Sequence, residues 1–265
     1  MRTRVRRRRV VRGAAAAMLV VGVAGATLAL EVVMALRRDY IRTAPAAEIG
    51  GTFGPPNGAY GRPLRFAVLG DSTAAGLGAG SAGRSYPVLL ARRLGDAGFR
   101  VELIDLGVSG ARTADVAATQ APRAAAAHPD LVLVAIGGND VTHLTHLAAV
   151  RHDMRAALVA LGTTGARVVV TGVPDMRAHA FLEPLRSIAG WRGRIMSRAI
   201  EAVARDQGVG FVPLAERTGH FFAEDPAGNF SSDLFHPGPG GYRRWADAIY
   251  PELARALEGV RTGAG

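Results

Sequence analysis

At residues 66–73 the chain reads Phe66-Ala67-Val68-Leu69-Gly70-Asp71-Ser72-Thr73, an apolar run that ends abruptly in Gly-Asp-Ser. The residues that follow, 74–80, are mostly small and rich in glycine. This pattern is typical of a buried parallel strand that carries a hydroxyl group to the C-terminal edge of a sheet, where the sites of open α/β proteins lie. A plainer interpretation is a strand-to-helix turn in which Ser72 or Thr73 only caps the helix. The rest of the chain has to decide between them.

Beyond this stretch, short β-branched runs alternate with longer helical segments. Because the expected strands are apolar on both faces and are separated by helices, they fit a parallel sheet that helices cover on both sides. The sequence therefore predicts one α/β domain over residues 63–260, a three-layer α/β/α sandwich with a five-stranded parallel sheet. Strands are expected at 64–69, 101–106, 130–136, 167–171 and 209–212, and helices at 86–97, 147–161, 191–207 and 240–257.

The positive charge of the chain lies at its N-terminus. Residues 1–42 contain ten Arg against Glu31 and Asp39, a balance of +8, so only +2 of the net charge of +10 belongs to the rest. A basic face for nucleic acid would instead be spread over the folded domain. We expect no nucleic-acid partner.

The same N-terminal segment predicts a membrane anchor. The uncharged run at 13–30 is about 27 Å long as a helix, close to the thickness of a bilayer core. The Arg cluster before it predicts that the N-terminus stays in the cytoplasm and the remainder is exported. We expect a cytoplasmic tail and signal-anchor helix over residues 1–42, a flexible linker over 43–62, and a single-pass protein of the cell membrane. The alternative is a secreted protein, cleaved after Ala24-Gly25-Ala26.

Two residue types are missing from the chain, which contains neither cysteine nor lysine. The absence of cysteine excludes disulfides, thiol nucleophiles, cysteine–zinc sites and a lipid-modified N-terminus. The absence of lysine excludes a P-loop, a Schiff base and a Ser–Lys dyad. We expect no cofactor and no metal.

Polar and glycine residues follow three of the predicted strands, at 70–72, 107–109 and 137–140. Because the carboxyl ends of parallel strands meet at one edge of a sheet, these residues should lie close together. Backbone N–H groups of Ser72 and Gly107, with the side-chain amide of Asn139, could then stabilise an oxyanion.

The loop before the last helix adds Asp233 and His236. Side chains three residues apart on one turn can both point into a site. The carboxylate can accept the imidazole N–H, orient the ring, and stabilise the imidazolium that forms when His takes a proton from Ser. This ordered set of residues favours a nucleophilic Ser72 over a helix cap.

Four short segments, at 70–72, 107–110, 137–140 and 233–236, resemble the motif blocks of the SGNH/GDSL hydrolase family. The resemblance extends over about residues 64–257. The resemblance implies Ser72 as the nucleophile, His236 as general base and then acid, and Asp233 as the residue that orients it. It also implies an oxyanion hole formed by Ser72 N–H, Gly107 N–H and Asn139 Nδ2, on a flavodoxin-like fold. One departure is a carboxylate, Asp105, where the family commonly has Asn.

We therefore expect a membrane-anchored serine ester hydrolase outside the cytoplasm that acts through an acyl-enzyme on a small-molecule, lipid or glycan ester. An acyltransferase or a carbohydrate O-acetylesterase would use the same residues. A hypothesis of another class is a non-catalytic, membrane-tethered binding module.

Three other features remain open. Ser109, in Gly107-Val-Ser-Gly-Ala111, resembles the nucleophile elbow of α/β-hydrolases and is a rival nucleophile. His143 and His146 could suggest a metal, although no Glu follows in the pattern of zinc proteases. The Arg-rich stretch 177–194 is interpreted as a solvated helix face, with contact to an anionic or sugar-containing substrate as the alternative.

Overall fold

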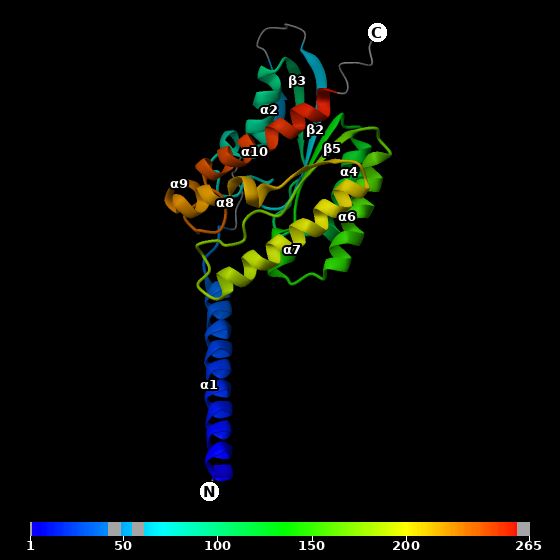
Figure 1. Cartoon of the computed structure of the whole chain (residues 1–265). Helices are drawn as coiled ribbons and strands as arrows, with labels where there is room; N and C mark the ends of the chain where they lie inside the picture. Colours follow the sequence, from blue (N-terminus) through cyan, green and yellow to red (C-terminus); the bar gives the residue numbers. More distant parts are fainter. Residues whose placement is uncertain (1, 42–48, 55–60, 259–265) are drawn as a thin grey trace.

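A six-stranded sheet lies at the centre of the domain, with its strands in the order β1-β3-β2-β4-β5-β6 (Figure 1). The structure, a computed structural model, describes residues 2–41, 49–54 and 61–258. Five strands run parallel, and β1 pairs antiparallel with β3 at one edge. The strands are β1 (Gly50–Phe53), β2 (Arg62–Gly70), β3 (Phe99–Asp105), β4 (Leu131–Ala135), β5 (Arg167–Thr171) and β6 (Gly210–Val212).

The sixth strand corrects the prediction of a five-stranded, wholly parallel sheet. Strand β1 lies inside the stretch 43–62 that the sequence predicts to be a linker, of which 43–48 and 55–60 fall outside the described residues. The sequence gives no sign of β1 because Gly50 and Gly51 carry no side chain. The pairing of β1 with β3 uses backbone hydrogen bonds, and Phe53 packs against the core. The five predicted strands and the α/β class are confirmed.

Helices cover both faces of the sheet, as a three-layer sandwich requires. Helices α2, α8 and α10 pack together on one side, and α4, α6 and α7 on the other (Figure 1). The long helices are α2 (Tyr86–Asp96), α6 (Leu147–Gly162), α7 (Leu185–Asp206), α8 (Leu214–Glu224) and α10 (Pro239–Glu258). The shorter ones are η1 (Ala82–Arg84), α3 (Thr113–Asp115), the π-helix η2 (Val116–Gln120), α4 (Ala121–Ala126), α5 (Gly138–Thr142) and α9 (Pro226–Asn229).

The register of the central strands brings their ends to one edge. Gly70 at the end of β2 lies opposite Ala135 at the end of β4, and Val68 lies opposite Asp105 at the end of β3. Both central strands are buried on both faces, which explains their continuous apolar sequences. The polar residues that follow these strands are therefore gathered at the C-terminal edge.

Helix α1 (Arg2–Arg37) projects from the same end of the domain (Figure 1). Its segment Met18–Arg37 is long and apolar enough to cross a membrane, with a mean hydropathy of 2.2, and almost all of it is exposed. Near its C-terminal end the helix touches the domain, where Glu31 Oε2 accepts a hydrogen bond of 2.9 Å from the backbone N–H of Leu185.

Candidate active site

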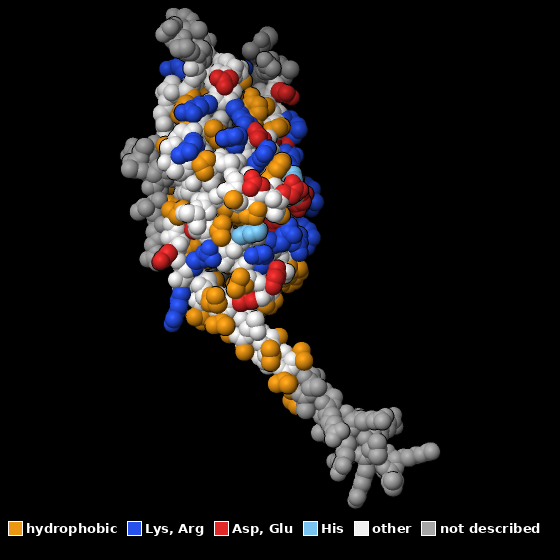
Figure 2. Space-filling view, turned by 90° about the vertical axis from the view of Figure 1, so that its left-hand side faces the viewer, with side chains coloured by type: hydrophobic (Ala, Val, Ile, Leu, Met, Phe, Trp, Pro, Cys, Tyr) orange, Lys and Arg blue, Asp and Glu red, His pale blue; other side chains and the backbone are white. Residues whose placement is uncertain are grey.

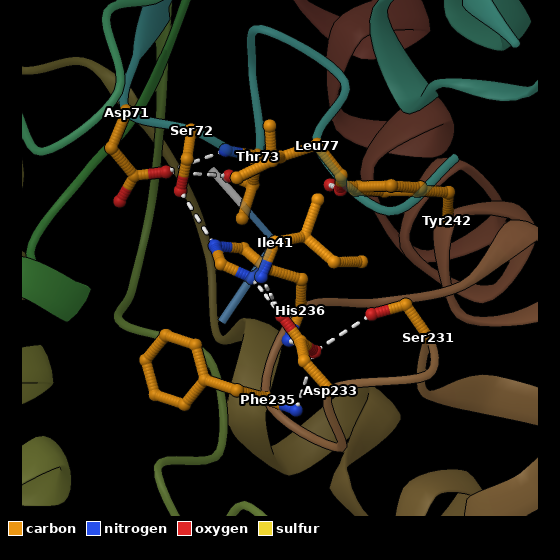
Figure 3. Close-up of polar contacts among 10 residues, drawn as sticks. All are labelled: Ile41, Asp71, Ser72, Thr73, Leu77, Ser231, Asp233, Phe235, His236 and Tyr242. Atoms are coloured by element: carbon orange, nitrogen blue, oxygen red, sulfur yellow. Dashed lines mark hydrogen bonds and ion pairs between the residues drawn. The ribbon is translucent and has the colours of Figure 1, made fainter. Parts of the chain in front are cut away.

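Ser72, His236 and Asp233 form a continuous line of hydrogen bonds (Figure 3). Ser72 Oγ lies 3.0 Å from His236 Nε2, and His236 Nδ1 lies 2.7 Å from Asp233 Oδ2. All three residues are at most 9% exposed. Ser72 follows β2, whereas the other two lie in the loop before α10, so the fold joins segments 164 residues apart. The arrangement can pass a proton from a hydroxyl to an imidazole that a carboxylate orients.

The turn that presents Ser72 is held by its neighbours. The buried Gln120 side chain accepts a hydrogen bond from Gly70 N–H and donates one to Gly70 O, each 2.9 Å long. Glycine is required at this position because a Cβ would lie 2.5 Å from the carbonyl oxygen of Ala135. Gln120, which the sequence analysis missed, therefore fixes the end of β2 just before the serine.

Asp71 braces the turn and is not hydrogen-bonded to His236. Its Oδ1 accepts hydrogen bonds from Thr73 N–H at 2.9 Å and from the Thr73 hydroxyl at 2.8 Å. Burial raises the pKa of Asp71 above its usual range, against the opposing effect of these bonds. Further along the loop, the hydroxyl of Tyr242 donates to the carbonyl of Leu77, which fastens the segment after Ser72 to α10 (Figure 3).

The carboxylate of Asp233 receives hydrogen bonds on both oxygens. Oδ1 accepts from the Ser231 hydroxyl at 2.7 Å and from the backbone N–H groups of Phe235 and His236 at 2.9 Å. Oδ2 accepts from His236 Nδ1 and, at 3.2 Å, from the backbone N–H of Ile41. Burial alone would raise the pKa of Asp233, but these hydrogen bonds outweigh it and hold the pKa well below its usual range. The group is therefore ionised at neutral pH.

The contact with Ile41 comes from outside the predicted domain. Ile41 and the preceding Tyr40 belong to the segment after α1, and Figure 3 places Ile41 beside His236. The ring of Tyr40 packs edge-on against Phe235, with their centroids 5.3 Å apart. No motif signalled this contact, because a backbone N–H donor leaves no trace in a sequence.

The three predicted oxyanion donors differ in their surroundings. Ser72 N–H has no acceptor among the described residues. Asn139, at the start of α5, lines the same pocket as Ser72, and its Nδ2 donates to Ala111 O at 2.9 Å. Gly107 N–H donates to Asp105 Oδ1 at 3.1 Å, so in this structure it already has an acceptor.

Gly110 carries another backbone N–H group in the turn after β3, but the residue is exposed and does not line the pocket that Ser72 lines. It lies in the same turn, next to the Ala111 carbonyl that Asn139 contacts, and has a φ of 81°, which favours glycine. Its N–H has no acceptor within the described part of the chain.

Asp105 should make stability depend on pH. Burial raises its pKa to about 7, although the hydrogen bond from Gly107 N–H opposes this. Because the folded state holds the proton more tightly than the unfolded state, stability falls as pH rises from about 4 to about 7 and is then constant. Asp105→Asn is expected to raise the free energy of unfolding at pH 8, by at most about 4 kcal/mol, and to change it little at pH 4.

Urea unfolding of the detergent-solubilised chain at pH 4, 6 and 8 would measure this difference. Asp96→Asn, at an exposed position on α2, is the matched control and should show no such pH-dependent gain. An equal effect of Asp105→Asn at all three pH values would contradict the assignment of a raised pKa.

The other candidate residues from the sequence do not join the Ser72–His236–Asp233 line. Ser109 is exposed, and within the described residues it contacts no histidine. The buried Asp140 accepts two 3.0 Å hydrogen bonds from Thr113 and ties α5 to α3. His143 and His146 are both exposed. The described part of the chain holds no cluster of three or more His, Cys, Asp or Glu side chains that could bind a metal.

The arginines of the stretch 177–194 are not simply a solvated helix face, because several of them bind backbone carbonyls or a carboxylate. Arg192 donates from Nε to Val141 O at 3.2 Å and from Nη2 to Thr145 O at 2.6 Å. Arg186 Nε donates to Phe181 O at 2.9 Å, and Arg177 forms an ion pair with Asp175. These guanidinium groups hold loops at the C-terminal edge in place.

A pocket adjoins Ser72 and His236 and encloses about 740 Å³ of space, its open mouth included. Most of its wall is apolar, and its polar residues lie mainly near the serine. Trp245 Nε1, on the wall, is buried and has no hydrogen-bond partner among the described residues. The apolar wall consists of Ala135, Ile136, Pro174, Met176, Ala178, Leu214, Phe222, Phe230, Phe235, Pro237 and Trp245.

Known proteins are similar to this chain in sequence and in fold. Residues 68–244 match the model of the GDSL-like Lipase/Acylhydrolase family, which confirms the resemblance found in the sequence. The chain is 34% identical over 193 residues to the GDSL-like esterase Rv1075c of Mycobacterium tuberculosis, a match that covers 72% of this chain and 62% of that protein. It is 26% identical over 195 residues to esterase TesA of Pseudomonas aeruginosa, which covers 72% of this chain and 88% of that one.

Solved structures are also similar to this chain in fold. The crystal structure of TesA superposes with a TM-score of 0.61 at 25% identity, over 73% of this chain and 99% of that one. The acetylxylan esterase Axe2 of Geobacillus stearothermophilus superposes with a TM-score of 0.58 at 20% identity, over 73% and 95% of the two chains. At that identity the second similarity shows the fold alone.

Proposed function

Because this chain belongs to the GDSL-like lipase/acylhydrolase family, we propose that it is a serine ester hydrolase that works through an acyl-enzyme at the outer surface of a membrane. The observation that carries the proposal is the line of hydrogen bonds from Ser72 Oγ through His236 to Asp233, set beside an apolar pocket. Every step can be assigned to a residue of the chain.

In the first half of the reaction, Ser72 Oγ attacks the ester carbonyl while His236 Nε2, 3.0 Å away, takes its proton. Asp233 stabilises the imidazolium that results and keeps Nδ1 protonated. His236 then gives the proton to the alkoxide oxygen of the leaving alcohol as its bond to the carbonyl carbon breaks. The acyl group remains on Ser72.

The second half repeats these roles with water. His236 takes a proton from the water as it attacks the acyl-enzyme, and then returns a proton to Ser72 Oγ as the acid departs. An alcohol in place of water would give acyl transfer with the same residues. The apolar pocket wall suits the acyl part of the substrate, because burying an acyl chain there removes it from water.

The negative charge on the carbonyl oxygen needs donors that are already in place. We assign Ser72 N–H and Asn139 Nδ2 to this role. Gly107 N–H, the third donor expected from the sequence, donates to Asp105 Oδ1 in this structure and remains a proposed third donor.

Asn139→Ala is expected to lower kcat by about 10²- to 10³-fold, because one preorganised oxyanion donor is lost. KM should change much less, since the donor acts on charge that develops in the transition state. Steady-state hydrolysis of p-nitrophenyl butyrate would measure both constants. Thr142→Ala, on the exposed side of the same short helix, is the matched control. A rise in KM with unchanged kcat would assign Asn139 to substrate binding instead.

We also propose that α1 is a single-pass anchor with the Arg-rich N-terminus in the cytoplasm and the catalytic domain outside. The hydropathy of Met18–Arg37 and the cluster of Arg before it support this orientation. Cleavage after Ala24-Gly25-Ala26, which would release the domain, remains the alternative.

Labelling with a fluorophosphonate tests the proposed function directly. The purified full chain should react with the probe at Ser72 and lose its hydrolysis of p-nitrophenyl butyrate in proportion. Heat-denatured protein, in which the hydrogen-bonded line is broken, is the control and should not react. A folded chain that neither reacts nor hydrolyses esters would support a non-catalytic binding module.

A further inference from the structure

The last turns of α1 lie against the domain. Glu31 is only 6% exposed and accepts the N–H of Leu185, the first residue of α7, while Ala35 packs against the core. The uncharged run that ends at Leu30 is about 27 Å long, which matches the hydrocarbon thickness by itself. If α1 spans a bilayer, the membrane surface therefore lies level with the start of α7.

The end of the domain next to α1 is the end that carries the candidate site. Helix α7 leads into the parallel strand β6, so it begins at the C-terminal edge of the sheet. The segment after α1 runs directly to the acid–base loop, where Ile41 N–H contacts Asp233 and Tyr40 packs against Phe235. Figure 1 shows α1 leaving the domain at this end, beside the start of α7.

Exposed hydrophobic side chains gather at the same end. Outside α1, six large hydrophobic residues are exposed in the described part of the chain, and only Val159 lies away from the C-terminal edge. Four of the others come from adjacent segments and form what we call the apolar rim. The rim consists of Leu144 (68% exposed), Leu182 (51%), Ile188 (41%) and Trp191 (57%). Figure 2 shows hydrophobic side chains at the base of the domain, above α1.

The rim is a fixed surface. Leu144 has a φ of 55°, which an L-residue rarely adopts, and yet its side chain points into solvent. Arg192, on α7 next to Trp191, holds this loop through its bonds to the carbonyls of Val141 and Thr145. The loop that carries Leu144 and the helix that carries Trp191 are thereby joined into one face.

The rim also continues into the pocket wall. Gly138 and Asn139 line the pocket, and the chain reaches Leu144 a few residues later. Ala178 lines the pocket as well, and Leu182 follows it in the same way. The rim is thus joined by two short segments to the pocket that Ser72 lines.

We propose that the apolar rim rests in the interfacial layer of the bilayer that α1 crosses, and that the site takes its ester from a membrane lipid. This inference rests on the proposed function, both the ester hydrolysis and the α1 anchor. A lipid surface is the partner that fits, because Leu182 and Ile188 flank Leu185, whose N–H binds Glu31 of the proposed membrane-spanning helix. The exposed Trp191 of the rim is also of the residue type that is enriched at membrane interfaces.

The first test uses the full chain reconstituted in phosphatidylcholine vesicles. Because the chain has no cysteine, Ile188→Cys introduces a single site for a nitroxide label. The label should be more accessible to oxygen, which concentrates in lipid, than to a water-soluble nickel chelate. Val159→Cys, exposed on another face, is the control and should show the opposite preference. A water-exposed label at Ile188 would overturn the proposal.

The second test separates lipid access from chemistry. The double variant Ile188→Ser/Trp191→Ser should hydrolyse soluble p-nitrophenyl butyrate as the natural chain does. Its rate on a fluorogenic diacylglycerol in the same vesicles should fall about tenfold or more, since the reacting ester is no longer held in position. Val159→Ser should leave both rates unchanged. Equal rates of lipid hydrolysis in the double variant and the natural chain would overturn the proposal.

Other outcomes bear on the proposed function instead. If the natural chain hydrolyses neither ester, the enzymatic assignment fails, and if it does not float with the vesicles, the anchor fails. If the double variant loses both rates through misfolding, the label at Ile188 still decides where the rim lies. A label at Ile188 that neither oxygen nor the nickel chelate reaches would mean that a co-purifying protein covers the rim. This result would also contradict a lipid-facing rim.

Discussion

Ser72→Ala is expected to lower kcat for p-nitrophenyl butyrate by about 10⁴- to 10⁶-fold, because the nucleophile is removed while the residual oxyanion and binding contributions remain. The alanine should not disturb the turn. The bonds that hold it, from Gln120 to Gly70 and from Thr73 to Asp71, do not use the serine hydroxyl. Circular dichroism and the unfolding midpoint of the detergent-solubilised chain should therefore stay unchanged while turnover is lost.

Ser109→Ala is the matched control for this experiment. Ser109 is exposed in the turn after β3, and its removal should change kcat by less than about twofold, as for surface positions in general. Activity that survives in Ser72→Ala and disappears in Ser109→Ala would move the nucleophile to the elbow-like turn.

Asp233→Asn should lower kcat by about 10³- to 10⁴-fold. The carboxylate Oδ2 now accepts the Nδ1 proton of His236 over 2.7 Å. An amide can donate there instead, which favours the tautomer with the proton on Nε2, where it cannot accept a proton from Ser72. The variant also lacks the charge that stabilises the imidazolium. Turnover of p-nitrophenyl butyrate between pH 6 and 9 would measure the loss.

The low pKa of Asp233 gives this variant a second readout, in stability. A carboxylate whose folded pKa lies below its unfolded value adds stability above about pH 4 and loses it as pH falls through the folded value. The natural chain should therefore exceed Asp233→Asn in stability at neutral pH, and the difference should shrink in acid.

Asp71→Asn is the matched control, since Asp71 is an equally buried carboxylate one residue from the serine. Its oxygen only accepts hydrogen bonds from Thr73, which an amide oxygen can also do. Its kcat should fall by about tenfold at most. A larger loss in Asp71→Asn than in Asp233→Asn would mean that Asp71 orients the histidine.

The sequence predicted the parts of the fold that depend on side-chain pattern. The buried strands β2 and β4 read as continuous apolar runs, and their ends carry residues whose types and order identify the family. The structure brings Ser72, Asp233 and His236 into hydrogen-bonding distance, as the spacing of the latter two suggested. Their catalytic roles stay predictions until they are tested.

What the sequence could not predict depends on backbone groups and on contacts between distant segments. Strand β1 pairs with β3 through main-chain groups, and two of its four residues are glycines. The direction of Gly107 N–H is set by Asp105, a contact within one turn that the motif does not describe. Arg192 binds two backbone carbonyls, which no charge pattern reveals.

The hydrogen bond from Ile41 N–H to Asp233 has a consequence for where the polypeptide can be cut. A chain trimmed by signal-peptide cleavage after Ala26 would keep Glu31, Tyr40 and Ile41. It would therefore keep the contacts of these residues with Leu185, Phe235 and Asp233. A fragment that starts at residue 43 would contain every residue of the Ser–His–Asp line and still lack these contacts. We therefore expect the shortest fully active fragment of this protein to begin within α1, ahead of Glu31, and not at the first residue of the sheet.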